Sequence, residues 1–208
     1  MNIDPHDYAE TFIAEDSVKS AARARGIENG VTDVSQGTGA YLRQLAHQIK
    51  AQAVVEIGTG SGVGALWLLE GMLSSGTLTS IDDVMEHSSI AKLALSEADI
   101  AQPRYRLITN SVMDVMTKLT DRAYDLVVYR HNPEDLSFAI SEAHRILRSG
   151  GVFVIDNFFG GGKVPDPAQR DPKTVALREA GKSIKNDTDS WVTSLAPIGD
   201  GLLLATKL

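Results

Sequence analysis

Short runs of apolar residues alternate along this chain with stretches in which apolar residues recur every three to four positions. The runs typical of buried strands cover residues 53–57, 77–81, 105–108, 125–129 and 152–155. Between them, patterns with helical spacing cover residues 63–73, 86–101 and 136–147. Strands that are apolar on both faces are typical of parallel sheets, because helices cover both sides of such a sheet. The alternation therefore predicts an α/β fold with a doubly wound, mostly parallel sheet and helices on both faces.

The two ends of the chain depart from this alternation. The first 50 residues have a helical pattern, interrupted over residues 26–39 by a stretch rich in glycine that predicts a loop. Near the other end, Asp171-Pro172 is a typical helix start, and the helix is expected to run to about Lys185. Two short apolar runs then flank the turn Ile198-Gly199-Asp200-Gly201, which predicts an antiparallel hairpin at the edge of the sheet. We expect one domain over residues 1–208, with a helical segment (1–50) before the α/β core (51–208).

Composition excludes several classes of protein. The chain has 208 residues with 20 Lys+Arg and 27 Asp+Glu, so its net charge of −7 disfavours a nucleic-acid-binding protein, which needs a basic surface. It has no Cys, so disulfides, thiolate metal sites and a cysteine nucleophile are excluded. No apolar run approaches the roughly 20 residues that span a bilayer, and the N-terminus does not resemble an export signal. We expect a cytoplasmic protein that does not associate with membranes.

A glycine-rich loop follows the first predicted strand, in the segment Glu56–Gly64 (EIGTGSGVG). Glycines allow the backbone to turn tightly and to approach a ligand closely. Asp82 ends the next strand, where a carboxylate can accept hydrogen bonds from the ribose hydroxyls of a nucleoside. Glu56 would repel a pyrophosphate, but it suits a cationic ligand such as S-adenosylmethionine. The loose dinucleotide fingerprint Gly60-x-Gly62-x-x-Ala65 leaves a nicotinamide oxidoreductase as an alternative.

Several segments together resemble the bacterial catechol O-methyltransferase-like family, which includes the caffeoyl-CoA O-methyltransferases. The resemblance rests on the glycine-rich loop, on Ile81-Asp82, on Arg148–Gly151 (RSGG), on Asp156-Asn157 and on the final segment 197–204 (PIGDGLLL). It implies a Rossmann-like fold with a seven-stranded sheet and a homodimer. It also implies methyl transfer from S-adenosylmethionine to a hydroxyl of a small, phenolic acceptor.

The resemblance assigns candidate cofactor-binding residues position by position. Glu56, Gly58, Thr59 and Gly64 are expected around the methionine part of the cofactor, and Gly60, Gly62 and Arg130 are further candidate cofactor-binding residues. Asp82 is expected to hold the ribose. Val112 and Met113 match a segment that contacts adenine, and Val34 matches a loop position that closes over the cofactor.

The sequence departs from this family after the fourth strand. The family has Asp-x-Asp-Lys there, in which the first Asp binds a divalent metal with the later Asp-Asn pair, whereas this chain has Arg130-His131-Asn132-Pro133. Asp156 and Asn157 are the expected metal ligands, but a cation at position 130 makes normal affinity for Mg²⁺ doubtful.

Three hypotheses follow from this departure. In the first, Arg130 replaces the metal, pairs with Asp156 and holds the acceptor oxygen, with His131 as a candidate base. In the second, a metal is bound weakly through Asp156, Asn157 and Asn132. In the third, the chain binds the cofactor but has lost or altered its catalysis.

Overall fold

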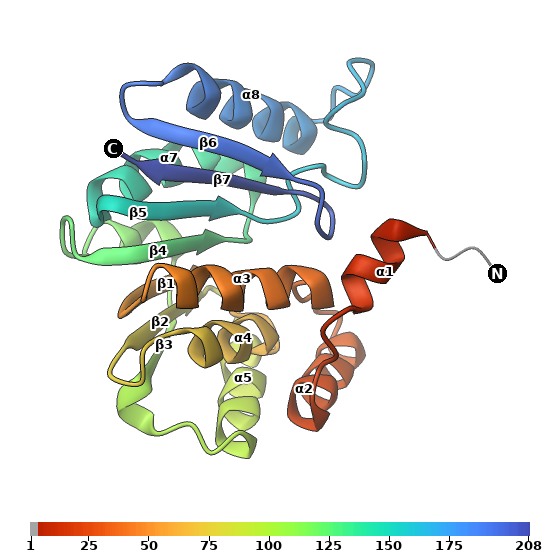
Figure 1. The fold of residues 1–208 in the computed structure, drawn as a ribbon, viewed down its shortest axis with the longest axis vertical. Helices are drawn as coiled ribbons and strands as arrows, with labels where there is room; N and C mark the ends of the chain where they lie inside the picture. Colours follow the sequence, from red (N-terminus) through yellow and green to blue (C-terminus); the bar gives the residue numbers. More distant parts are fainter. Residues whose placement is uncertain (1–3) are drawn as a thin grey trace.

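The computed structural model of the protein, described over residues 4–208, is built around one seven-stranded sheet (Figure 1). Its strands are β1 (Ala53–Ile57), β2 (Thr77–Asp82), β3 (Tyr105–Thr109), β4 (Tyr124–Tyr129), β5 (Leu147–Ile155), β6 (Trp191–Ala196) and β7 (Leu202–Lys207). They lie in the order β3-β2-β1-β4-β5-β7-β6. β1 to β5 pair in parallel, whereas β7 pairs antiparallel with both β5 and β6. The predicted fold class and the closing antiparallel hairpin are confirmed.

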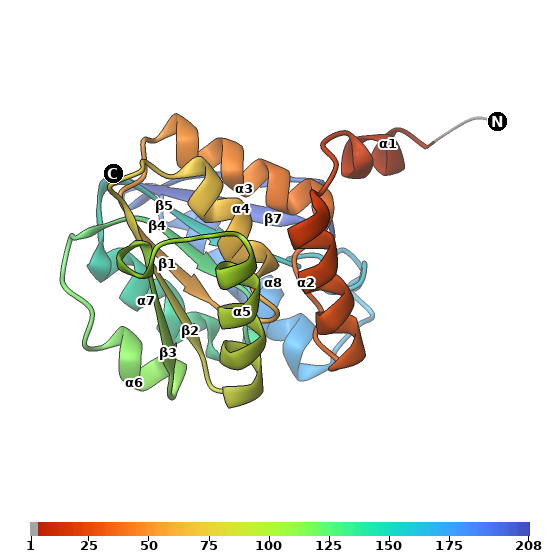
Figure 2. The same cartoon turned by 90° about the horizontal axis from the view of Figure 1, so that it is seen from below.

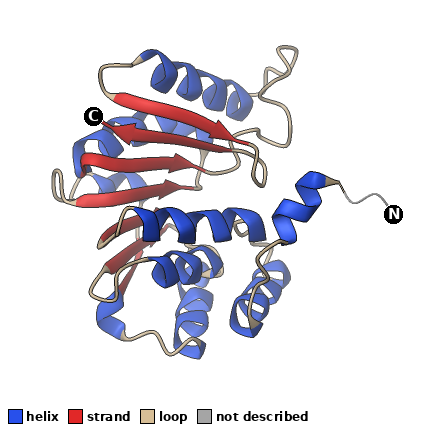
Figure 3. Ribbon diagram, in the orientation of Figure 1, coloured by secondary structure: helices blue, strands red, loops and turns tan. Residues whose placement is uncertain are grey.

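Helices cover both faces of this sheet (Figures 2 and 3). The α-helices are α1 (Pro5–Thr11), α2 (Ser17–Glu28), α3 (Gln36–Gln48), α4 (Val63–Gly71), α5 (Met85–Glu97), α6 (Val112–Met116), α7 (Leu136–Ile146) and α8 (Pro172–Asn186). Short 3-10 turns occur at η1 (Gln102–Arg104) and η2 (Pro133–Asp135). None of the helices described between residues 4 and 208 is long and apolar enough to cross a lipid bilayer.

Two apolar cores lie on opposite sides of the sheet. Successive side chains of a strand point to opposite faces, so Val54 belongs to one core and its neighbour Val55 to the other. The same alternation separates Val154 from Phe153 and Ile155 on β5. The continuous apolar runs of the sequence are therefore explained by burial of the strands on both faces.

The N-terminal segment differs from the sequence prediction in one respect. The glycine-rich stretch 26–39 is not one loop, because α2 extends to Glu28 and α3 begins at Gln36. Its three helical glycines are closely packed: an added Cβ would lie 2.2 Å from the Trp67 ring at Gly39, 2.6 Å from the Asp33 carboxylate at Gly26 and 2.6 Å from the Glu10 carboxylate at Gly37. Only residues 29–35 form a loop, which we call the N-terminal loop.

Two other helices differ in extent from the prediction, and one helix was not predicted. α4 ends at Gly71 and α5 at Glu97, before the expected ends at residues 73 and 101. The short helix α6 was not predicted, because its five residues are too few to show helical periodicity. In contrast, α8 begins directly after its N-cap residue Asp171, as the sequence indicates.

The strand order reverses between β1 and β4, and this reversal positions the candidate site. Connections leave β1 toward β2 on one side and β4 toward β5 on the other, so a crevice opens at the carboxyl ends of β1 and β4. The glycine-rich loop follows β1, and Arg130 follows β4. The backbone N–H of Arg130 donates to the carbonyl of Ile57 at 2.8 Å, so the two segments leave the sheet side by side.

Candidate functional site

The glycine-rich loop has a backbone that only glycine adopts readily. Gly58, Gly60 and Gly62 have φ angles of +94°, +55° and +91°. At Gly58 an added Cβ would also lie 2.1 Å from the carbonyl oxygen of Arg130. The loop therefore passes against the end of β4 with no room for a side chain.

Glu56 lies at the end of β1, fully enclosed behind this loop. Its Oε2 accepts a hydrogen bond from Ser80 Oγ at 2.6 Å, and Ser80 Oγ also pairs with Thr59 Oγ1 at 2.7 Å. Burial raises the pKa of Glu56 to about 7, and the hydrogen bond from Ser80 only partly opposes that shift. The site thus holds a buried carboxyl group that a cationic ligand would keep ionised.

Asp82, at the end of β2, is buried and faces the same loop. Its Oδ2 accepts from the backbone N–H of Gly60 at 3.2 Å, and its Oδ1 accepts from the N–H of Val84 at 3.0 Å. His87 Nδ1 lies 3.0 Å from both carboxylate oxygens. These contacts hold the Asp82 carboxylate at the mouth of the crevice.

The N-terminal loop is tied down over the glycine-rich loop by Asp33. The Asp33 carboxylate accepts hydrogen bonds from the backbone N–H of Ser61 at 2.9 Å and from its hydroxyl at 2.5 Å. The sequence analysis missed Asp33, because a loop aspartate carries no local signal of a partner 28 residues away.

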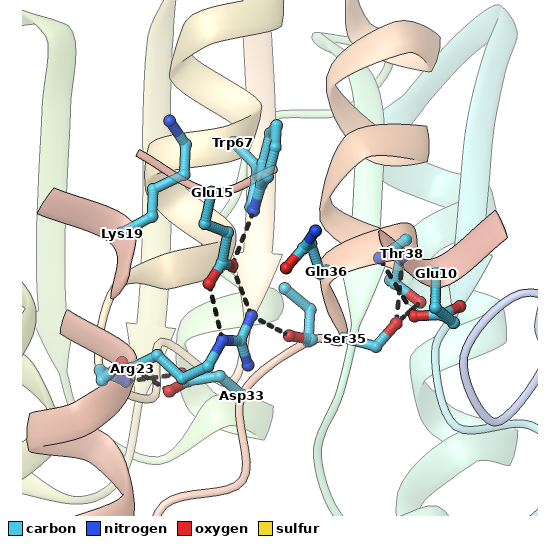
Figure 4. Close-up of polar contacts among 12 residues, drawn as sticks. Glu10, Glu15, Lys19, Arg23, Asp33, Ser35, Gln36, Thr38 and Trp67 are labelled. Carbon is cyan, nitrogen blue, oxygen red and sulfur yellow. Dashed lines mark hydrogen bonds and ion pairs between the residues drawn. The ribbon is translucent and has the colours of Figure 1, made fainter. Parts of the chain in front are cut away.

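A second anchor holds the next residue of the same loop (Figure 4). Arg23 donates to the carbonyl of Val34 at 2.8 Å, and the Glu15 carboxylate binds the Arg23 guanidinium in a bidentate pair at 2.6 and 2.9 Å. Glu15 is itself buried and accepts from the Trp67 indole at 3.3 Å. The N-terminal segment thereby positions the loop beside the crevice.

Arg130 lies between the two loops and the end of β5. Its Nη2 donates to the carbonyl of Gly58 at 2.9 Å, and its Nη1 donates to the carbonyl of Thr32 in the N-terminal loop. Its Nε lies 3.9 Å from Asp156 Oδ2, which is a charge contact and too long for a hydrogen bond. Burial raises the pKa of Asp156, and the Arg130 charge opposes that shift.

His131 follows Arg130 and is oriented by a carboxylate. Its Nε2 lies 3.3 Å from Asp83 Oδ2, and its ring lies edge-on to that of Tyr129. His131 Nδ1 is buried and has no hydrogen-bond partner among residues 4–208. Asp156 Oδ2 is also buried without such a partner within the described chain.

Two cavities meet at these side chains. The smaller, of about 260 Å³, lies beside the glycine-rich loop and is lined by Gly30, Val31, Thr32, Gly58, Gly60, Asp82, Asp83, His87, Arg130 and His131. The larger, of about 840 Å³, has an apolar wall that includes Leu136, Ile155 and Leu177, and Asp156 and Asn157 lie on its lining. Thr32, Arg130 and His131 line both cavities, so they stand at the boundary between them.

The donor set at Asp156 does not fit a divalent metal. No group of three or more His, Cys, Asp or Glu side chains within residues 4–208 is arranged to hold a metal ion. Hard cations require several oxygen ligands, whereas the nearest charged group to Asp156 Oδ2 is the cationic guanidinium of Arg130. Asn157 contributes its backbone N–H to Asp156 Oδ1 at 2.8 Å.

The other expected site residues lie behind the crevice or outside it. Val34 and Val112 are buried in the two apolar cores, and Met113 is 40% exposed. None of these three lines either cavity. Gly64 lies inside α4, where an added Cβ would be 2.3 Å from Glu56 Oε1, so it makes room for that carboxyl group. The expected contacts of these residues with a cofactor stay predictions.

The sheet order and the crevice at the strand reversal define a protein of the Rossmann-like fold class. The family model described as O-methyltransferase matches residues 6–208, and the chain belongs to that family. A protein of Mycobacterium sp. (strain KMS), provisionally named an O-methyltransferase, is 44% identical over 200 residues, which cover 96% of this chain and 90% of that protein.

Solved structures show the same similarity. A Corynebacterium glutamicum protein superposes with a TM-score of 0.89 at 30% identity, covering 96% of this chain and 94% of that one. The O-methyltransferase TomG of Streptomyces achromogenes, solved in complex with S-adenosylmethionine, superposes with a TM-score of 0.85 at 25% identity, over 96% of this chain and 93% of that one. The recognition of an O-methyltransferase family from the sequence is therefore confirmed.

Proposed function

We propose that this chain transfers the methyl group of S-adenosylmethionine to a hydroxyl of a small, phenolic acceptor. The observation that carries this proposal is the position of Arg130, on the boundary between a small cavity beside the glycine-rich loop and a larger, partly apolar cavity. A group-transfer enzyme needs two such sites that meet at the reacting atoms. The small cavity is the proposed cofactor site, and the large one is the proposed acceptor site.

The residues around the small cavity suit this cofactor. Gly58 and Gly60 line this cavity with backbone alone, and the Asp82 carboxylate on the same lining suits ribose hydroxyls. The carboxyl group of Glu56, buried behind the loop, suits a ligand with a positive charge. A pyrophosphate would be repelled by the same carboxyl groups, which disfavours the nicotinamide alternative. When bound, S-adenosylmethionine supplies a methyl group on a positively charged sulfur. TomG, a relative of this chain, is described in complex with that compound.

Arg130 takes the place of the family's metal in this proposal. A fixed guanidinium stabilises negative charge that develops on the acceptor oxygen. As the methyl group moves from sulfur to oxygen, the sulfur keeps the electron pair of the broken bond and the hydroxyl loses its proton. Asp156 and His131 are the bases next to Arg130, and we propose them as the residues that receive this proton.

Isothermal titration with S-adenosylhomocysteine tests the cofactor site, with NADH as the competing ligand. We expect saturable binding of the first compound and none of the second. Release of labelled methyl product over a panel of phenols then tests transfer, with Arg130→Gln as the variant that lacks the positive charge. Absence of S-adenosylhomocysteine binding at millimolar concentration would contradict the proposal.

The alternative function is cofactor binding without transfer. Arg130 and Pro133 favour it, because they replace a metal-ligand aspartate and a lysine of the resembling family. Binding of S-adenosylhomocysteine without methyl transfer to any phenol, with or without Mg²⁺, would support this alternative.

We also propose that the protein is a cytoplasmic homodimer. Val192 and Leu195 are 60% and 47% exposed on the edge strand β6, and Tyr8 and Phe12 are exposed on α1. Light scattering after size exclusion measures the mass, and a monomer of 22.4 kDa would contradict the proposal.

A further inference from the structure

The resembling family holds a metal at this place. In this chain the same place contains one hydrogen-bond donor and one acceptor, which are too far apart to bond to each other. Arg130 Nε and Asp156 Oδ2 are 3.9 Å apart. A guanidinium has five N–H groups, and two of the three nitrogens of Arg130 already donate, to Gly58 and Thr32. The Nε–H makes no hydrogen bond with any described residue.

Asp156 Oδ2 is the matching acceptor. The Asp156 side chain is 1% exposed, and its Oδ1 accepts from the Asn157 backbone. Asp156 is on the lining of the larger cavity, and its Oδ2 is buried without a hydrogen-bond partner within residues 4–208. A buried carboxylate oxygen without a partner is costly, so such an atom points to a ligand that completes it.

One oxygen atom that lies to the side of the line joining these two atoms can reach both of them. A hydroxyl oxygen at ordinary hydrogen-bond distance from both groups, about 2.8 Å, fits a separation of 3.9 Å between them. Its lone pair would accept from the Arg130 Nε–H, and its own hydrogen would donate to Asp156 Oδ2. That hydroxyl would then have both its lone pair and its hydrogen engaged, so the pair needs no second hydroxyl on the next carbon.

We propose that the Arg130–Asp156 pair recognises a single hydroxyl without a metal, so that the acceptor is a monohydroxylated compound and needs no vicinal diol. The inference rests on the function proposed above. Metal chelation selects vicinal diols because two neighbouring oxygens bind one ion, and the donor set here does not fit such an ion. The apolar wall of Leu136, Ile155 and Leu177 suits an acceptor whose body is an uncharged ring system.

Titration with Mn²⁺, followed by electron paramagnetic resonance, tests the metal-free site directly. We expect the wild-type protein to bind no Mn²⁺ at about 1 mM, a concentration at which even weak sites for divalent cations are occupied. Arg130→Asp restores the carboxylate of the resembling family and is expected to gain Mn²⁺ binding. Binding of Mn²⁺ by the wild-type protein that is lost in Asp156→Asn would overturn the inference. Circular dichroism and thermal denaturation of each variant verify that it is folded, and Arg130→Gln provides a neutral substitution if Arg130→Asp does not fold.

Paired acceptors test the recognition of one hydroxyl. Each vicinal diphenol is compared with the monophenol of the same skeleton, after dialysis against EDTA and again with Mg²⁺. We expect the two members of a pair to react within about threefold of one another, and EDTA to change neither rate. Arg130→Gln should raise the KM of the monophenol at least tenfold.

The outcomes separate this inference from the function on which it rests. Turnover of diphenols alone, stimulated tenfold or more by Mg²⁺, would leave the methyltransferase function standing and overturn the inference. Failure of S-adenosylhomocysteine to bind would contradict the function itself. If S-adenosylhomocysteine binds but no phenol reacts, transfer to phenols is contradicted. The comparison of Mn²⁺ binding between the wild type and the variants still decides whether the site is metal-free.

Discussion

The two cavities on either side of Arg130 differ in how completely their polar groups are paired. Around the glycine-rich loop, which borders the smaller cavity, the carboxyl groups of Glu56, Asp82 and Asp33 all accept hydrogen bonds from the protein. On the lining of the larger cavity, Asp156 has one carboxylate oxygen, Oδ2, that is buried without a partner in the described chain. A site whose groups are already fixed is preorganised for one ligand, whereas unpaired groups must be completed by a ligand. The comparison supports the proposal that the cofactor side is built in advance and that the acceptor completes its own side.

Replacing one glycine on each side gives the largest contrast in stability. Gly58→Ala should lower the free energy of unfolding by about 3 kcal/mol, because the new Cβ would meet the Arg130 carbonyl at a positive φ. Gly161→Ala, in the open loop after β5, should cost only about 1 kcal/mol, because its φ is also positive but nothing lies within 4 Å. Urea denaturation of both variants measures the difference. Equal losses would contradict the contrast between a packed and an open side.

The buried carboxyl group of Glu56 predicts a pH dependence of stability. Its pKa is raised from 4.5 to about 7 in the folded chain, so between these values the folded state binds a proton that the unfolded state has lost. The free energy of unfolding of the cofactor-free protein should therefore fall by up to about 3 kcal/mol as the pH rises from 4.5 to 7. In Glu56→Gln this contribution should disappear. If the free energy of unfolding depends on pH in the same way in the wild type and in the variant, Glu56 is ionised in the folded protein and its pKa is not raised.

Removing the carboxylate at the end of β2 should weaken the proposed cofactor site selectively. We expect Asp82→Ala to reduce the affinity for S-adenosylhomocysteine about 30-fold, or about 2 kcal/mol, because the ribose partner and the anchor of the Gly60 backbone are both lost. Glu86→Ala, an exposed carboxylate on the first turn of α5, is the matched control and should stay within twofold. Calorimetric titration compares the affinities of the two variants for S-adenosylhomocysteine. Equal affinities would contradict a role of Asp82 in cofactor binding.

The smallest expected effect concerns the N-terminal loop. Arg23→Gln removes the donor to the Val34 carbonyl and the bidentate pair with Glu15, so the loop should close less well over the cofactor. We expect about fivefold weaker binding of S-adenosylhomocysteine, or about 1 kcal/mol. Arg25→Gln is the control, because Arg25 lies on the same helix and also pairs with a glutamate, Glu97, away from the loop. A similar loss in both variants would indicate a general effect on α2.

Much of the fold and of the cofactor side could be predicted because their signals are local. Five apolar runs predicted the five parallel strands, since burial on both faces leaves a pattern readable in any short window. The loop after β1 was recognised from its glycines, whose positive φ angles need that residue type. Helical glycines such as Gly39 are the exceptions. Gly39 predicted a loop in the sequence, but it lies in a helix where Trp67, far away along the chain, leaves no room for a side chain.

The amino-acid sequence by itself determined the order of strands and helices, the glycine-rich loop and the substitution of Arg130 for a metal-ligand aspartate. Only the tertiary structure decided what Arg130 contacts, because its partners Gly58 and Thr32 lie 72 and 98 residues away along the chain. The same holds for the pair of Asp33 with Ser61. Residue type and spacing limit what a side chain can do chemically, but the reversal of strand order between β1 and β4 sets which distant groups it meets.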